Sequence, residues 1–142
     1  MIVYLAVDDE NGMMFNNRRQ SQDRIMRQNM LKDCGSSRLW IAEYSQKLFT
    51  TTDGSDFPSN IIVNNEFLSL AEENDYCFVE NQSITEWADK IDTLVLYKWN
   101  KSYPADFYFD PAVLTNMKRF AVSKFTGSSH DKITKEVWKR AK

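Results

Sequence analysis

Side chains of the types that carry out chemistry are sparse in this sequence, and Asp23 is the most suggestive of them. It lies at the start of a predicted helix that Ser21 can cap. A carboxyl group can take part in proton transfer. The helix dipole alone also favours an acidic residue in the first turn. Asp23 is therefore a candidate catalytic residue with a structural alternative.

Four arginines near this helix start form the one notable basic cluster: Arg18, Arg19, Arg24 and Arg27. Guanidinium groups on a loop and a helix start can bind a phosphate, a nucleotide or an acidic partner. A solvated surface with i,i+3 pairing is the more favoured interpretation. If the cluster binds anything, the sequence predicts an anionic small molecule or an acidic protein surface.

Two other groups of polar residues are weaker candidates. The carboxylates of Asp8–Glu10 are of the kind that Mg²⁺ or Ca²⁺ requires, but adjacent residues of a turn rarely converge on one ion. His130, the only histidine, follows Ser129 and precedes Asp131. A Ser-His-Asp triad needs groups that the fold brings together, so we interpret this segment as a hairpin turn with local backbone bonding. We predict no metal site.

Composition excludes several classes of protein. The 18 Lys and Arg against 20 Asp and Glu give a net charge of -2, so nucleic-acid binding is disfavoured. The four tryptophans lack accompanying basic residues and are interpreted as packing residues. Cys34 and Cys77 form no CxxC pair and are expected to be free buried thiols. No apolar run approaches the ~18 residues of a membrane span, so we expect a cytoplasmic protein without a membrane partner.

The elements that must position these groups alternate along the chain. Strands are predicted at 2–7, 39–41, 60–63 and 76–79, and helices from Ser21 to Cys34, over 43–49 and over 83–90, with a loop from Thr50 to Ser59. The last third reads as strands at 93–99, 107–109, 117–125 and 132–140, without a helix. We predict a three-layer α/β fold in one domain over 1–142, with a central mostly parallel sheet and antiparallel C-terminal strands.

Several segments occur in the order found in the dihydrofolate reductase fold, which this chain therefore resembles. They are Leu5-Ala6-Val7-Asp8 before Asn11-Gly12, Phe57-Pro58 before Asn60-Ile61-Ile62-Val63, and Ala105-Asp106-Phe107-Tyr108-Phe109. The resemblance places Asp23 at the family's acidic residue and so implies that its carboxyl group donates a proton to a bound heterocycle. Ala6 is a further candidate ligand-binding residue, in addition to Arg18, Arg19, Arg24 and Arg27.

The sequence departs from the family where the cofactor and substrate would bind. No Gly-Gly pair is present to let the backbone approach a pyrophosphate, and Ala42-Glu43 stands where the family has Gly-Arg. Arg24 and Arg27 replace apolar pocket residues. The strand, glycines and helix that should precede Thr93 have no counterpart between Lys90 and Thr93, so either the strands beside the missing one pair directly or the match to the family is shifted there.

These departures predict a degenerate member of the dihydrofolate reductase fold that binds no cofactor and acts in ligand or protein binding. The alternative is an NADPH-dependent reductase of a pterin or a related heterocycle. NADPH is expected only under that alternative.

Overall fold

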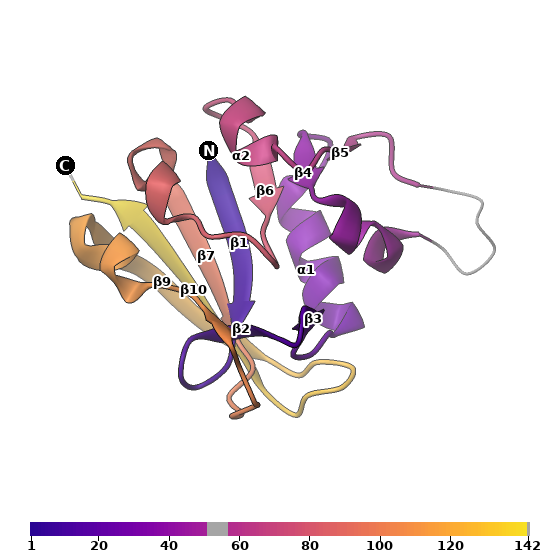
Figure 1. The fold of residues 1–142 in the computed structure, drawn as a ribbon, viewed down its shortest axis with the longest axis vertical. Coiled ribbons are helices and arrows are strands. Elements are labelled where there is room, and N and C mark those ends of the chain that lie inside the picture. Colours follow the sequence, from indigo (N-terminus) through magenta and orange to yellow (C-terminus); the bar gives the residue numbers. More distant parts are fainter. Residues whose placement is uncertain (51–56, 142) are drawn as a thin grey trace.

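A seven-stranded sheet runs through the computed structural model, which describes residues 1–50 and 57–141 (Figure 1). Its order is β5-β4-β6-β1-β7-β10-β9. The strands are β1 (Ile2–Val7), β4 (Leu39–Ile41), β5 (Ile61–Val63), β6 (Tyr76–Phe78), β7 (Thr93–Lys98), β9 (Met117–Phe125) and β10 (Ile133–Arg140). The first five strands in the order are parallel to one another, whereas β10 is antiparallel to both β7 and β9. This confirms the predicted fold class.

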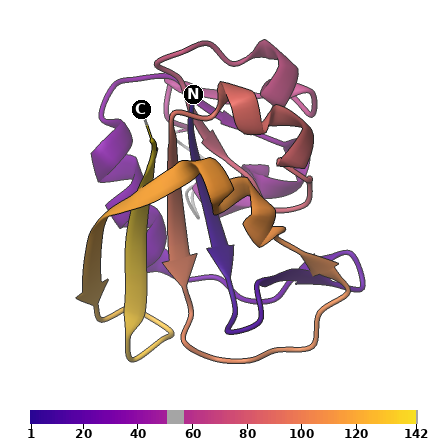
Figure 2. The same ribbon diagram turned by 90° about the vertical axis from the view of Figure 1, so that its left-hand side faces the viewer.

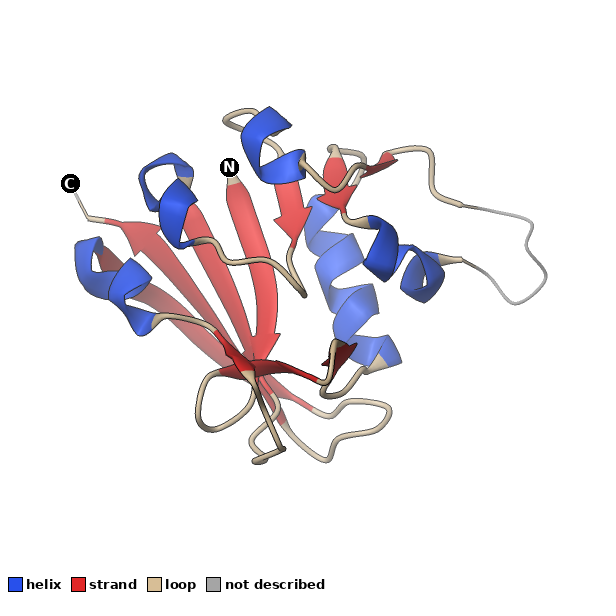
Figure 3. Ribbon diagram, in the orientation of Figure 1, coloured by secondary structure: helices blue, strands red, loops and turns tan. Residues whose placement is uncertain are grey.

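Helical segments cover both faces of the sheet, which explains why β1 is continuously apolar (Figures 2 and 3). On one face, Tyr4 packs in a cluster with residues of α1 (Arg24–Cys34) and η1 (Glu43–Phe49). On the other, Val3 and Leu5 pack with residues of α2 (Phe67–Leu70) and η3 (Pro111–Asn116) and with Trp87 of η2 (Thr85–Lys90). The two faces of one strand therefore contribute to two separate apolar clusters.

Helix α1 begins and ends at identifiable residues. Its N-cap is Asp23, whose carboxylate accepts a hydrogen bond from the Met26 amide at 3.0 Å, so the predicted cap at Ser21 is wrong by two residues. Its end is as predicted, because Gly35 adopts a φ of 56°, which costs a glycine little.

Short elements make up most of the remaining differences. Strands β2 (Gly12–Phe15), β3 (Arg18–Arg19) and β8 (Phe107–Tyr108) form a second, three-stranded sheet where a polar loop and part of the large sheet were predicted. Helix α2 was not predicted. The expected absence of a helix in the last third is also wrong, because Asp110 caps η3 and Pro111 begins it. Residues 51–56 of the predicted loop lie outside the described residues.

No strand lies among the described residues between η2 and β7, and the interior of the sheet is formed by strands that were predicted elsewhere. Strand β6 lies between β4 and β1 and is parallel to both. It is followed not by glycines but by Val79 and then by Glu80-Asn81-Gln82, which lead to η2. Among the described residues, none of the helices combines the length and the apolar character that crossing a membrane would require.

Candidate functional site at the carboxyl end of the sheet

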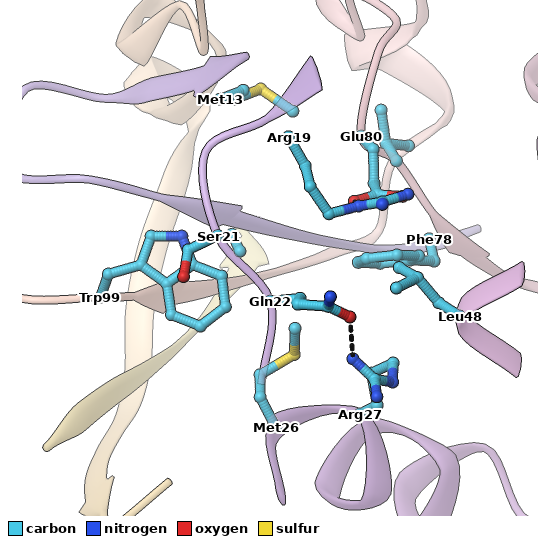
Figure 4. A pocket seen from close by; sticks show the side chains of 12 residues that line it. Met13, Arg19, Ser21, Gln22, Met26, Arg27, Leu48, Phe78, Glu80 and Trp99 are labelled. Atoms are coloured by element: carbon cyan, nitrogen blue, oxygen red, sulfur yellow. Dashed lines mark hydrogen bonds and ion pairs between the residues drawn. The ribbon is translucent and has the colours of Figure 1, made fainter. Parts of the chain in front are cut away.

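A narrow cavity opens at the carboxyl ends of β1 and β6, with Ala6 and Phe78 in its wall (Figure 4). From here the chain leaves β1 toward α1 and leaves β6 toward η2 on the opposite face. Such a divergence point is where open α/β sheets usually bind ligands. The cavity volume is about 20 Å³, which is room for one or two water molecules.

One wall of the cavity is an ion pair between Arg19 and Glu80. The guanidinium donates to both carboxylate oxygens, at 2.7 and 3.0 Å, and lies 4.5 Å from the centre of the Tyr44 ring. The Ser45 hydroxyl donates to the same carboxylate at 2.7 Å. A two-bonded pair of this kind is geometrically specific, so the Arg19 charge is already neutralised by the protein.

Arg27 is the cation of the cavity for which the described residues provide no carboxylate partner. Within the described ranges it has no carboxylate at ion-pair distance, and its guanidinium donates only to the Gln22 side-chain oxygen, at 3.2 Å (Figure 4). Burial lowers the pKa of Arg27, and the more distant Asp23 charge only partly opposes this effect. A partly buried guanidinium without an ionic partner favours an anion beside it.

Asp23 lies next to the cavity but does not line it, because its carboxylate is turned toward the turn 127–130. It accepts the backbone amides of Ser128 and Ser129 at 3.0 and 2.8 Å, in addition to its bond as the N-cap of α1. Burial would raise the pKa of this carboxyl, but these amides, with His130 at 3.1 Å, lower it well below its ordinary value. The group is therefore held as an anion.

Asn65 forms hydrogen bonds with the start of η1 and with the segment just before η2. The side-chain oxygen of Asn65 accepts the backbone amide of Glu43 at 2.9 Å, and its backbone carbonyl accepts the side chain of Gln82 at 2.9 Å. Backbone amides at helix starts are the groups that usually meet a phosphate. Here the first amide of η1 is satisfied internally, and a carboxylate side chain stands beside it.

The remaining candidates lie elsewhere. Arg18 lines a separate, open hollow of about 460 Å³ with Phe15 and Pro104, and Arg24 is exposed. Asp8 is buried and accepts the amides of Glu10, Gly12 and Tyr103, so it orders its turn. In residues 1–50 and 57–141, no three His, Cys, Asp or Glu side chains are grouped so that they could hold a metal ion.

Three of the six predicted site residues line the cavity: Ala6, Arg19 and Arg27. Sequence reasoning missed Gln22 and Glu80. Glu80 had a usable signal, since it comes just after a predicted parallel strand, where ligand-facing residues gather.

Comparison of the sequence with protein-family models and with curated proteins gives no match. Comparison of the structure finds a dihydrofolate reductase from Enterococcus faecalis, solved as a complex with NADP(H) and RAB-propyl. The two superpose with a TM-score of 0.70 over 99% of this chain and 96% of the other, at 10% sequence identity. The extent of the match, taken with the sheet order and the cavity at its carboxyl end, establishes that this chain has a dihydrofolate reductase-like fold.

Proposed function

We propose that this dihydrofolate reductase-like protein binds a small anionic ligand at the mouth of its cavity, beside Arg27, and does not use a nicotinamide dinucleotide as a reductant. The observation that carries the proposal is Arg27, a partly buried guanidinium in the cavity wall without a carboxylate partner among the described residues. Gln22 orients it and offers an amide nitrogen to the same ligand.

Three features support the loss of reductase chemistry. Glu80, two residues beyond the end of β6, puts a carboxylate and not a glycine backbone in the cavity wall at the carboxyl end of the sheet. Glu43 and Asn65 likewise occupy the start of η1. A carboxylate repels a phosphate, and each of these side chains fills space that close backbone approach requires.

Asp23 supports the same conclusion. Proton donation near neutral pH requires a carboxyl group whose pKa is raised, as in a desolvated pocket without donors. The pKa of Asp23 is lowered instead, by the amides that surround it. The reductase alternative needs this carboxylate to leave the turn 127–130 and face the cavity.

A thermal-shift titration with inorganic phosphate and with succinate tests the proposal. We expect either anion to raise the Tm of the wild-type protein and of Arg24→Gln, because Arg24 is exposed on the same helix. Arg27→Gln should abolish the shift. Equal shifts in Arg27→Gln and the wild type, or no shift in any of the three, would show that the Arg27 cavity is not an anion site.

A further inference from the structure

His130 is held between an anion and a hydroxyl group that come from a distant part of the chain. Its Nδ1 lies 3.1 Å from the Asp23 carboxylate, and its Nε2 lies 3.0 Å from the Ser21 hydroxyl. The ring stacks on Trp99 with centroids 4.4 Å apart and planes 18° from parallel. The sequence neighbour Asp131 is exposed and takes no part.

The hydrogen bonds fix the tautomer of the neutral ring. An ionised carboxylate only accepts hydrogen bonds, so Nδ1 carries the proton and Nε2 presents a lone pair. Two hydroxyl groups face that lone pair, Ser21 at 3.0 Å and Tyr103 at 3.2 Å. Ser21 lines the cavity and Tyr103 does not.

This array has the order of groups that activates a serine nucleophile: carboxylate, imidazole, hydroxyl. Several backbone amides donate hydrogen bonds to the Asp23 carboxylate and fix its position, as is usual for the carboxylate of such an array. We propose that Ser21 is a nucleophile activated by His130, with Asp23 as the positioning residue, and that the cavity hydrolyses small carboxylic esters.

Ester hydrolysis at Ser21 needs water as its only other reactant. The Ser21 oxygen attacks the ester carbonyl carbon while its proton passes to His130 Nε2, and that proton then leaves with the alcohol as the ester bond breaks. Water then attacks the acyl-serine while its proton passes to the same nitrogen, and that proton is returned to the Ser21 oxygen as the acid leaves. The side-chain amide of Gln22, which lines the cavity with Ser21, stabilises the carbonyl oxygen as it gains charge.

The cavity admits no more than the carbonyl end of a short acyl group, because its volume is about 20 Å³, so the alcohol part of the ester stays outside it. A preference for an ester that also carries an acidic group rests on the proposed anion site at Arg27. A neutral acetyl ester tests the nucleophile without that site, so the two proposals can fail separately.

The experiment follows 4-nitrophenol release from 4-nitrophenyl acetate by the full chain and locates the acetylated residue by mass spectrometry. We expect acetyl-Ser21 and turnover that falls on the order of 100-fold in Ser21→Ala and in His130→Gln. Ser36→Ala is the matched control, since Ser36 is an exposed serine just beyond the other end of α1. Tyr103→Phe should keep or increase the activity, because it removes the competing hydroxyl.

Asp23 is tested by comparing Asp23→Asn with Asp23→Glu. The amide of Asp23→Asn no longer holds the Nδ1 proton as a carboxylate does, so acetylation of Ser21 should be lost, whereas the carboxylate of Asp23→Glu should restore part of it. Circular dichroism checks that each variant is folded. The proposal is overturned if folded Ser21→Ala reacts as fast as the wild type, or if Tyr103→Phe alone abolishes the reaction.

Discussion

The Asp23 carboxylate joins the start of α1 to the turn 127–130, which is 105 residues away in the chain. Asp23→Ala would leave several buried amides and the His130 ring without their acceptor. We expect it to lower the free energy of unfolding by about 3 kcal/mol, measured by urea denaturation. Asp9→Asn, at an exposed carboxylate of the first turn, is the control and should change stability by less than ~0.5 kcal/mol.

The same residue predicts a dependence of stability on pH. Because the pKa of Asp23 is lower in the folded than in the unfolded chain, its stabilisation is complete above the unfolded value of about 4 and is lost as the pH falls through the folded value. The free energy of unfolding of the wild-type protein should therefore decrease as the pH falls from about 5 to about 2. Asp23→Asn should show a flatter acid profile. Parallel profiles for the two proteins would contradict this assignment.

Glu80 is expected to affect both the stability of the protein and its affinity for phosphate. Glu80→Gln removes the charge that neutralises Arg19 and weakens the bond from Ser45. We expect a loss of about 2 kcal/mol in the free energy of unfolding, together with tighter phosphate binding, because the cavity becomes more positive. Glu86→Gln, at an exposed carboxylate of η2, should change neither quantity. Unchanged stability in Glu80→Gln would mean that the ion pair does not form in solution.

At the scale of elements, the hairpin between β9 and β10 is docked on α1 through Gly127. A Cβ at this position would collide with the Asp23 carboxylate and would lie 2.8 Å from the Ile133 side chain. Gly127→Ala should therefore push the turn away from the helix start and cost about 1–3 kcal/mol. Thermal unfolding compared with Thr126→Ala, an exposed neighbour, checks this. Equal Tm values would show that the turn can shift without cost.

Single elements with local signals could be predicted from the sequence, but the pairing of the strands could not. Strand β1 and the end of α1 at Gly35 were recognisable, because a continuous apolar run and a helix-ending glycine are local signals. The central position of β6 was not, since a three-residue strand carries no information about which neighbours it pairs with. The small sheet of β2, β3 and β8 was missed for the same reason.

The site was predictable only in part, for a related reason. Arg19 and Arg27 were found because charge clusters are visible in the sequence. The partners that decide their roles, Glu80 for Arg19 and none among the described residues for Arg27, depend on tertiary structure. His130 was interpreted through its sequence neighbours, whereas its contacts come from Ser21 and Asp23.

In the molecule as a whole, each face of the sheet carries one buried thiol, so the two thiols can be used to follow the unfolding of the two faces. Cys34 is buried in the cluster with α1 and Cys77 in the opposite cluster, and burial raises the pKa of each to about 12. Both should resist Ellman's reagent in the native protein and become reactive at the same urea concentration, if the chain unfolds as one unit. Labelling of one thiol at a clearly lower urea concentration would indicate that the two faces unfold separately.

We propose that Glu80, Glu43 and Asn65 keep a nicotinamide dinucleotide out of the carboxyl end of the sheet. Calorimetric titration of the wild-type protein with NADPH measures this. We predict no binding heat up to millimolar NADPH, because these three side chains remain in place. Saturable binding at micromolar NADPH, with a stoichiometry of one, would contradict the proposal.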